Sequence, residues 1–281
     1  MENKYIHLNE LQRAGLNILK ETIKICQKHG LQYYIYGGTL LGAIRHKGFI
    51  PWDDDVDIAM PRKDYEKLKQ FQDELPDYMF LDTIQRKGHQ WTAAHVVDTR
   101  YKVEVGHGQK KAEMYVWMDI LIIDGVPTPG TLQYKLFSFA YLSARLLYKF
   151  SNFSKEVDLE KKRTPLEAFL IKFAKVTHIE KVINQHLSGC LLDWVSRQYD
   201  MDKCDYVATL AGPLKMDETI PKQWFGKGRE MQFEDIIVSG LGETERFLVK
   251  AYSENYMVPP PLDKRNQHNV RLIEKVRYYD K

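Results

Sequence analysis

The spacing of hydrophobic residues predicts alternating helices and strands in the first part of the chain. From Leu8 to His29 apolar residues return on one face of a helix, and Gly30 follows as a stop. A short aromatic and β-branched run, 33–36, predicts a strand that ends in Gly37-Gly38. A second short helix is expected over 40–46. The predicted unit is therefore helix, strand, glycine turn, helix.

Further along, proline residues separate a second strand from a charged helix. Pro51 breaks the chain, 56–60 has the pattern of a strand, and Pro61 opens an amphipathic helix over 62–75. Most of the sheet is then expected from four β-type runs at 78–84, 91–97, 101–105 and 115–123, the last ended by an Asp-Gly turn at Asp124-Gly125.

After residue 127 the pattern becomes mainly helical. The runs 132–150 and 166–199 have helical spacing, followed by short strand-like pieces around 230–238 and a helix over 244–256. We therefore predict an α/β (α+β) fold, a mixed sheet flanked by helices, with a mainly helical second part. The expected division is a catalytic core, a helical subdomain and a C-terminal segment that packs back on the core, over 1–127, 128–215 and 216–281.

Composition indicates a globular protein and narrows its partners. The 281 residues are 44% hydrophobic, enough for a full core, and the net charge of +3 gives no overall reason to expect nucleic acid. The cysteines Cys26, Cys190 and Cys204 lie far apart, so we expect reduced thiols in the cytosol. No signal pattern opens the chain, and no apolar run reaches the roughly 18 residues that span a bilayer.

Four aspartates just before the second predicted strand are the first candidates for chemistry. Asp53, Asp54, Asp55 and Asp57 lie within five positions, and such charge density is costly unless solvent or a cation neutralises it. Because residues two apart share one face of a strand, Asp55 and Asp57 are the predicted pair of ligands, suited to Mg²⁺ or Mn²⁺. The alternative is an acidic surface turn.

The glycine turn is a second candidate. Gly37-Gly38-Thr39 follows a strand and opens a helix, which lets backbone N–H groups face a phosphate, although a tight strand-to-helix connection explains the same residues. The order of features along the chain favours a functional site over a simple connection. A phosphate-binding turn comes first, then a short helix with Arg45 and His46, and then the aspartate pair.

A third carboxylate is expected from the strongest strand. Asp119 interrupts an otherwise apolar run, where an unpaired charge would be expensive, so it is predicted to complete the metal site or to accept a proton. Asp124 is instead expected to belong to the turn that ends this strand, with its side chain bonded to backbone amides.

These residues resemble a known family. The segments 37–46 and 48–57, supported by 118–120, 124–127 and 256–260, resemble the LicD family, which also includes the fukutin-related proteins. The resemblance implies a nucleotidyltransferase-like fold and transfer of phosphocholine from CDP-choline to a sugar hydroxyl of a bacterial surface glycan, such as teichoic acid, lipopolysaccharide or capsule, with release of CMP. It would make Asp55, Asp57 and Asp119 catalytic metal ligands and Gly37, Gly38, Thr39, Arg45 and His46 phosphate-binding residues.

A choline group would also need an aromatic surface, because its cation binds the faces of aromatic rings. The candidates near the expected site are Trp52, Trp91, Tyr115 and Trp117, and each of them equally well fills a core position.

The helix over 132–150 raises the question of a membrane. It combines a wide apolar surface with basic residues, a pattern that fits either peripheral binding to the inner face of a membrane that carries a lipid-linked acceptor, or packing within a helical subdomain. Two other functions stay open from sequence: a nucleotidyltransferase that moves a nucleoside monophosphate, and a non-catalytic membrane-associated scaffold.

Overall fold

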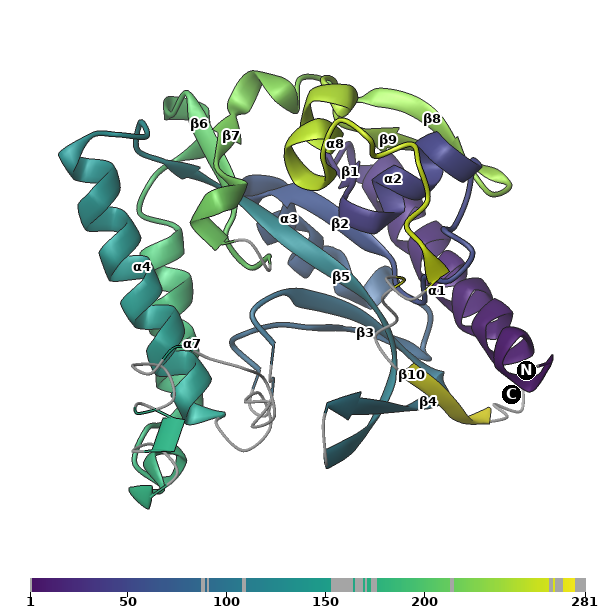
Figure 1. The fold of residues 1–281 in the computed structure, drawn as a ribbon, viewed down its shortest axis with the longest axis horizontal. Helices are drawn as coiled ribbons and strands as arrows, with labels where there is room; N and C mark the ends of the chain where they lie inside the picture. Colours follow the sequence, from purple (N-terminus) through teal and green to yellow (C-terminus); the bar gives the residue numbers. More distant parts are fainter. Residues whose placement is uncertain are drawn as a thin grey trace.

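A mixed β-sheet forms the centre of the molecule (Figure 1). This computed structural model describes residues 2–86, 89, 91–107, 110–152, 164, 169, 171–172, 176–212, 215–262, 265 and 270–275. In those residues the main path of the sheet runs β1-β2-β5-β4-β10, while β3 pairs with β4 and β6 bridges β5 and β7. Its strands are β1 (Tyr34–Ile35), β2 (Asp57–Pro61), β3 (Met79–Asp82), β4 (Ala94–His107), β5 (Lys110–Val126), β6 (Tyr206–Thr209), β7 (Ile220–Pro221) and β10 (Val270–Lys275).

The pairing of β2 with β5 is parallel, and the other pairs of this sheet are antiparallel. β5 is the long central strand, and its apolar side chains Met118, Ile120 and Ile123 are fully buried. The parallel register sets Asp57 directly beside Asp119. Two candidate residues 62 positions apart in sequence, 119 less 57, thus become neighbours on one face of the sheet.

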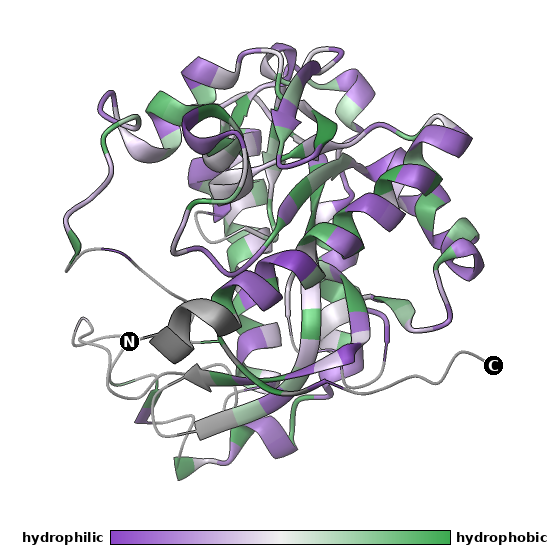
Figure 2. Ribbon diagram, turned by 90° about the vertical axis from the view of Figure 1, so that its right-hand side faces the viewer, coloured by the Kyte–Doolittle hydropathy of each residue, from purple (hydrophilic) through white to green (hydrophobic). Residues whose placement is uncertain are grey.

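Helices of the N-terminal half and a C-terminal helix enclose this sheet. They are α1 (Glu2–His29), α2 (Gly37–His46), α3 (Arg62–Leu68), continued by a 3-10 turn (Lys69–Glu74), and α8 (Thr244–Tyr252). Ile18 and Leu19 of α1 and Leu40 of α2 are completely buried in the main core. Figure 2 shows hydrophobic and hydrophilic positions alternating around these helices, as expected for one buried and one solvated face.

A small hairpin and several 3-10 turns complete the C-terminal half. The hairpin is β8 (Arg229–Phe233) and β9 (Ile236–Gly240), and the turns are Ile179–Lys181, Met201–Lys203, Lys215–Glu218 and Lys222–Trp224. The hairpin contacts α2 and β1. This contact is specific, since Glu234 at its tip accepts a hydrogen bond from the backbone N–H of Phe49 at 2.9 Å.

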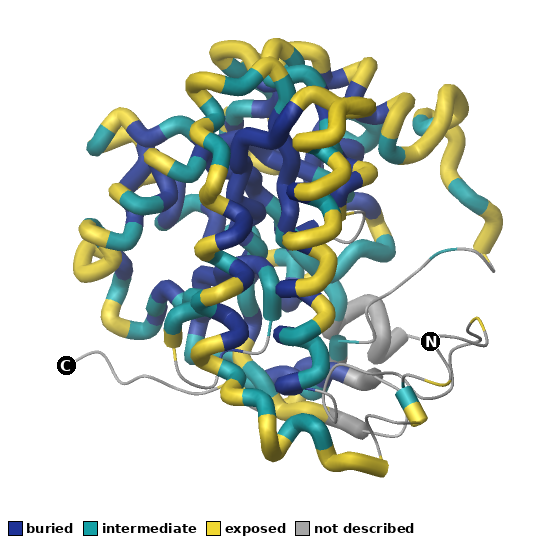
Figure 3. Tube along the Cα trace, turned by 90° about the vertical axis from the view of Figure 1, so that its left-hand side faces the viewer, coloured by how far each residue is buried: buried dark blue, intermediate teal, exposed yellow. Residues whose placement is uncertain are grey.

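A helical pair, α4 (Leu132–Ser151) and α7 (Gln185–Ser196), has a core of its own. Thr131 and Asn184 cap the two helices with side-chain oxygens that accept backbone N–H groups. Phe137, Tyr141 and Tyr148 of α4 pack with residues of α7 and with the end of β5. Figure 3, which views the molecule from this side, shows exposed segments on the pair in front of the buried strands.

The predicted fold class, a mixed sheet flanked by helices with a mainly helical second part, is confirmed. Three details of the expected elements are wrong. The runs 91–97 and 101–105 belong to one bulged strand, β4, because the irregular register between Asp98 and Lys102 lets pairing continue. The strand β10 is missed by the sequence pattern. Asp124 ends no strand: it lies inside β5, opposite Ala208 of β6.

The helix expected over 166–199 is only partly described. Its described residues are helical at 169, 171–172 and 176, in the 3-10 turn before α7 and in α7, with turns between them, and 166–168, 170 and 173–175 lie outside the described residues. The three-part division of the chain stays a prediction, although β6, from the expected helical part, is a strand of the main sheet. In the described part of the chain, every helix is too short or too polar to cross a bilayer.

Candidate active site

The N-terminus of α2 forms one wall of the candidate site. Tyr36 precedes the helix in an extended conformation and caps it with no side-chain hydrogen bond. Gly37, at φ +52°, opens the helix, and a Cβ there would lie 2.8 Å from Asp57 Oδ2. A Cβ at Gly38 would lie 2.7 Å from Asp53 Oδ2. The positive φ of Gly37 favours glycine, and at both positions a side chain would displace a carboxylate that stands over the first turn of the helix.

The loop that carries the aspartates is fixed from two sides. Gln12 of α1 donates from Nε2 to the carbonyl oxygens of Ile50 and Asp53, at 3.3 and 2.8 Å. On the other side, the buried Thr39 hydroxyl accepts the backbone N–H of Asp57 at 2.9 Å. Thr39 thus anchors the start of β2, and its hydroxyl faces the protein.

The carboxylates crowd together. Ligand oxygens of Asp53, Asp54 and Asp55 lie within 4.8 Å of one another. Burial raises the pKa of Asp57 well above its ordinary value, and the negative charges of Asp55 and Asp119 raise it further. The ionised form of Asp57 is therefore unfavourable unless a cation lies near it. Carboxylate oxygens gathered at a helix N-terminus therefore fit a hard divalent cation.

Asp119 has a partner that the sequence pattern does not reveal. Its Oδ1 lies 2.8 Å from Nε2 of His95, which is buried on the adjacent strand β4. The register pairs the two residues directly, His95 with Asp119. Asp119 thus stands between Asp57 on one side and His95 on the other.

A large cleft opens beside this cluster, with a volume of about 1020 Å³. Gly37, Gly38, Asp53, Asp55 and Asp57 line it together with α8 and the loop that follows. Among the described residues that line the cleft, Thr39 and Asp119 do not appear. Most lining residues outside the predicted set come from the C-terminal third, among them Asp217, Glu218, Phe247, Lys250, Tyr252, Asn255, Tyr256 and 258–261.

Glu218 is the most notable of these residues. It is buried, lines the cleft, and accepts a hydrogen bond from the Thr209 hydroxyl on β6. Its negative charge reaches Asp57, whose pKa it helps to raise after burial and the nearer aspartates. Gly212 makes room for it, since a Cβ there would lie 2.4 Å from Glu218 Oε1. Only the fold brings this carboxylate to the site, so no local sequence pattern reveals it.

Arg45 and His46 lie at the C-terminal end of α2, and Arg45 lines the cleft. The Arg45 side chain donates to the carbonyl oxygen of Tyr256 at 3.0 Å and to His46 Nε2 at 2.9 Å. Burial lowers the pKa of His46, and the positive charge of Arg45 lowers it further. His46 is therefore held as a neutral acceptor while Arg45 keeps its charge.

The four aromatic candidates for a choline group separate into two places. Trp52 lines the cleft, and the guanidinium carbon of Arg265 lies 4.0 Å from its ring centre. Trp91 and Trp117 instead stack on each other at 6.2 Å, next to His95. Tyr115 is 39% exposed on β5. Trp52 thus already binds a cation with its face, and the cleft adds Tyr36, Tyr252 and Tyr256 as aromatic surface.

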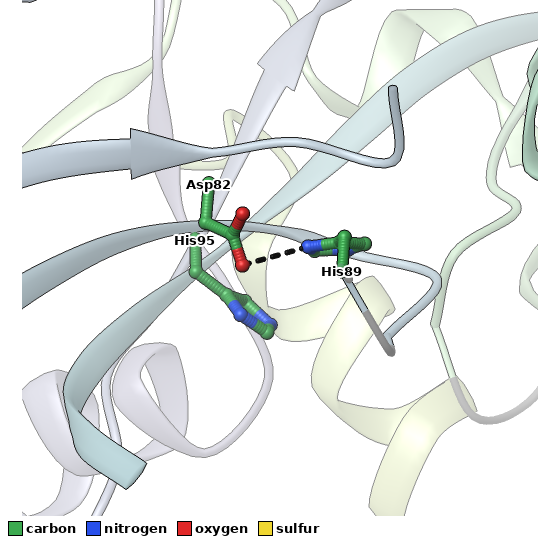
Figure 4. Close-up of side chains that lie close together, drawn as sticks. All are labelled: Asp82, His89 and His95. Atoms are coloured by element: carbon green, nitrogen blue, oxygen red, sulfur yellow. Dashed lines mark hydrogen bonds and ion pairs between the residues drawn. The ribbon is translucent and has the colours of Figure 1, made fainter. Parts of the chain in front are cut away.

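A second group of potential metal ligands lies behind Asp119. Ligand atoms of Asp82, His89 and His95 lie within 4.8 Å of one another and together can hold a metal ion. Figure 4 shows the three side chains close together. The sequence pattern does not predict this group.

A mixed sheet, convergent carboxylates, a glycine-opened helix and a large cleft together form a site that could hold a metal ion and a phosphate group. Residues 30–140 match the family described as LicD/FKTN/FKRP, nucleotidyltransferase domain. The predicted resemblance to the LicD family is therefore confirmed.

Two relatives indicate the chemistry of this family. The lipopolysaccharide cholinephosphotransferase LicD of Haemophilus influenzae is 29% identical over 94% of this chain and 97% of its own length. The human ribitol 5-phosphate transferase FKRP is 39% identical over 59 residues, 20% of this chain and 12% of that protein. Both relatives transfer phosphate-bearing groups, which supports a phosphotransferase class for this chain.

Proposed function

We propose that this chain is a metal-dependent phosphotransferase of nucleotidyltransferase type that moves phosphocholine from CDP-choline to a sugar hydroxyl of a bacterial surface glycan, releasing CMP. The observation that carries the proposal is the convergence of Asp53, Asp55 and Asp57 on the glycine-opened end of α2, inside a cleft of about 1020 Å³. The near end-to-end similarity to a cholinephosphotransferase supports the choice of transferred group.

In this proposal Asp55 and Asp57 would hold Mg²⁺ or Mn²⁺, which would neutralise negative charge on the diphosphate of the donor. Backbone N–H groups of Gly37 and Gly38 face phosphate oxygens at the helix N-terminus. Arg45 and Lys250, both on the cleft wall, balance negative charge that develops on the departing CMP. The sugar oxygen forms its bond to the phosphorus of phosphocholine as the bond from that phosphorus to CMP breaks.

The sugar hydroxyl must also lose its proton. Asp119 is placed for one of two tasks: it completes the metal set from the neighbouring strand, or it accepts this proton. Its Oδ1 faces His95 Nε2 at 2.8 Å, which leaves the second oxygen for that task. In the three-part division, residues 1–127 supply this chemistry and the helical part faces the acceptor.

The choline group has a plausible surface in this cleft. Trp52 with Tyr252 and Tyr256 provides aromatic faces near the carboxylates, and the face of Trp52 already accepts the guanidinium of Arg265. A choline cation would compete for such a face. Trp91, Trp117 and Tyr115 fit this role less well, since the residues described as lining the cleft do not include them.

The test is product formation by the purified protein with CDP-choline, Mg²⁺ and a glycan acceptor. We expect CMP release with transfer of phosphocholine, lost at least about 100-fold in Asp55→Asn. Asp77→Asn, which changes an exposed aspartate away from the cleft, is the matched control and should keep full activity. Pyrophosphate release would instead identify a nucleotidyltransferase, and no turnover together with no binding of CDP-linked compounds would favour a scaffold.

A further inference from the structure

Three potential ligands converge behind the proposed active site, from two paired strands and the loop between them. Asp82 ends β3, His95 lies opposite it in the antiparallel pairing with β4, and His89 lies in the connecting loop. Figure 4 shows the side chains gathered around the carboxylate of Asp82. Their ligand atoms lie within 4.8 Å of one another.

In each imidazole, the contact of Nε2 indicates which ring nitrogen carries the hydrogen. His89 Nε2 lies 3.0 Å from the carbonyl oxygen of Ala93, which can only accept, so this nitrogen carries the hydrogen. In the neutral ring the lone pair is then on Nδ1, which lies 2.9 Å from Asp82 Oδ2. A lone pair facing a carboxylate at this distance is repulsive. A cation must stand between the two atoms, either a proton or a metal ion.

His95 repeats this pattern. Its Nε2 lies 2.8 Å from Asp119 Oδ1, and a neutral ring with its hydrogen on this nitrogen has its lone pair on Nδ1. An imidazole that gives its outer N–H to a carboxylate or a carbonyl oxygen is the usual form of a metal-binding histidine. Two histidines with a lone pair on Nδ1, together with one carboxylate, provide three ligands.

Burial shields these three ligands from water. His89 and His95 are each 2% exposed, and the rings of Trp91 and Trp117 lie 6.0 and 6.1 Å from that of His95. Apolar surroundings of this kind control solvent access to a metal site and strengthen coordination bonds. His89 Nδ1 and Asp82 Oδ2 lie 2.9 Å apart, whereas two ligands about 2.1 Å from a tetrahedral ion are about 3.4 Å apart, so the two side chains need to separate by only about 0.5 Å to bind it.

We propose that Asp82, His89 and His95 bind a first-row transition metal ion such as Zn²⁺, at a site separate from the carboxylate site of the cleft. Two imidazoles and one carboxylate select such an ion over Mg²⁺, which prefers oxygen ligands. The bound ion locks His95, and His95 in turn orients Asp119. This second step rests on the proposed function, whereas metal binding itself does not.

Zinc binding to the whole protein tests the site without any assay of activity. The protein is stripped with a chelator and titrated calorimetrically with Zn²⁺ in excess Mg²⁺, which fills the carboxylate site of the cleft. We expect one equivalent of tightly bound Zn²⁺, with affinity reduced about 10- to 100-fold or more in His89→Gln and Asp82→Asn. Visible spectra with Co²⁺ should show imidazole coordination in the wild type and lose it in both variants.

Two controls separate this site from other zinc ligands. His29→Gln removes a histidine that also pairs with a carboxylate, Glu74 at 2.8 Å, and should leave binding unchanged. Cys190→Ser removes the thiol 3.7 Å from His186 and should do the same. Absence of stoichiometric Zn²⁺ binding in the wild type, or equal binding by His89→Gln, overturns the proposal and leaves a proton-linked Asp82–His89 pair. If both variants fail to fold, the wild-type Co²⁺ spectrum alone decides.

Discussion

Asp57 and Asp119 are direct partners in the parallel pairing of β2 with β5, the one parallel pair among the described strands of the main sheet. Neighbouring residues of paired strands point to the same face, so the two carboxylates face the same region above the sheet. Strong charge repulsion is therefore built into the centre of the fold. The candidate site follows from strand order more than from any single local motif.

This repulsion predicts how Mg²⁺ affects stability. Burial, then Asp55 and Asp119, raise the pKa of Asp57, so the folded state holds a proton on Asp57 more strongly than the unfolded state does. Without metal, the free energy of unfolding should fall as pH rises through the range above the ordinary carboxyl pKa. A cation offsets that loss, so Mg²⁺ should raise the Tm more near pH 8 than near pH 5. Thermal melts at both pH values check this, and equal shifts would contradict the assignment.

The close approach of the carboxylates to α2 predicts the effect of a single methyl group. In Gly38→Ala the new Cβ would lie 2.7 Å from Asp53 Oδ2, and the flexible carboxylate must move. We expect turnover to fall about 10- to 100-fold with little change in Tm, because the helix itself tolerates alanine. Gly242→Ala, with 3.3 Å to its nearest neighbour, is the control. An equally impaired control would point to general misfolding.

Periodicity and turn residues predict the elements near the site because their local signals are strong. The helix before Gly30, the strand around Tyr34 and the helix opened by Gly37 are all present. The division of β4 is wrong because a bulge is set by pairing with β5, which one sequence does not display. β10 is missed for the same reason: its pairing partner is β4, far away in the chain.

The same limit applies to the site. Asp55 and Asp57 stand out because four aspartates lie together, and Asp119 because it interrupts an apolar strand. Glu218 and His95 stand in ordinary sequence surroundings, and only the tertiary structure brings them to Asp57 and Asp119. The expected turn role of Asp124 fails because Arg62, 62 positions earlier, provides its ionic partner.

That ion pair predicts a large loss of stability. Arg62 donates twice to the buried Asp124, at 2.8 and 2.6 Å, and also to Asp193 of α7 at 2.7 Å. Burial alone would lower the pKa of Arg62, but the charges of Asp124 and Asp193 raise it above its ordinary value. Arg62→Met leaves Asp124 buried without its cation and should lower the free energy of unfolding by about 3–5 kcal/mol.

The neighbouring Lys63 is the control for Arg62. It pairs with Asp202 at 3.0 Å, but both side chains are more than half exposed, so Lys63→Met should change stability by less than about 1 kcal/mol. Urea denaturation of both variants makes the comparison. Similar losses in both would show that the buried network contributes no more than a surface pair.

Thiol reactivity should differ sharply along the chain. Cys26 is 1% exposed, and burial with the charge of Asp64 raises the pKa of its thiol to about 12. Only about one molecule in 10⁴ would carry the thiolate near pH 8. Iodoacetamide at that pH should therefore label the half-buried Cys190 in the native protein and spare Cys26, as read by peptide mass spectrometry. Labelling after unfolding in urea is the control, and rapid native labelling of Cys26 would contradict its burial.

The helical pair α4 and α7 has an exposed apolar face, and this face leads to a prediction of membrane binding. One side of α4 packs inward through Phe137 and Tyr141, while Leu136 and Phe139 are 61% and 74% exposed, and Trp194 of α7 is 58% exposed. Large apolar side chains gathered in this way usually meet a partner or a lipid surface. We expect the protein to float with anionic liposomes.

The double variant Leu136→Ser/Phe139→Ser should lose that binding, since it removes the side chains that would enter the interface. Ile237→Ser, which changes a 57% exposed residue of the β8–β9 hairpin, is the matched control and should still float. Flotation that is unchanged in the double variant, or absent in the wild type, would remove the membrane role. If sedimentation instead shows that the same two substitutions dissolve a dimer, the face binds a second copy of the chain.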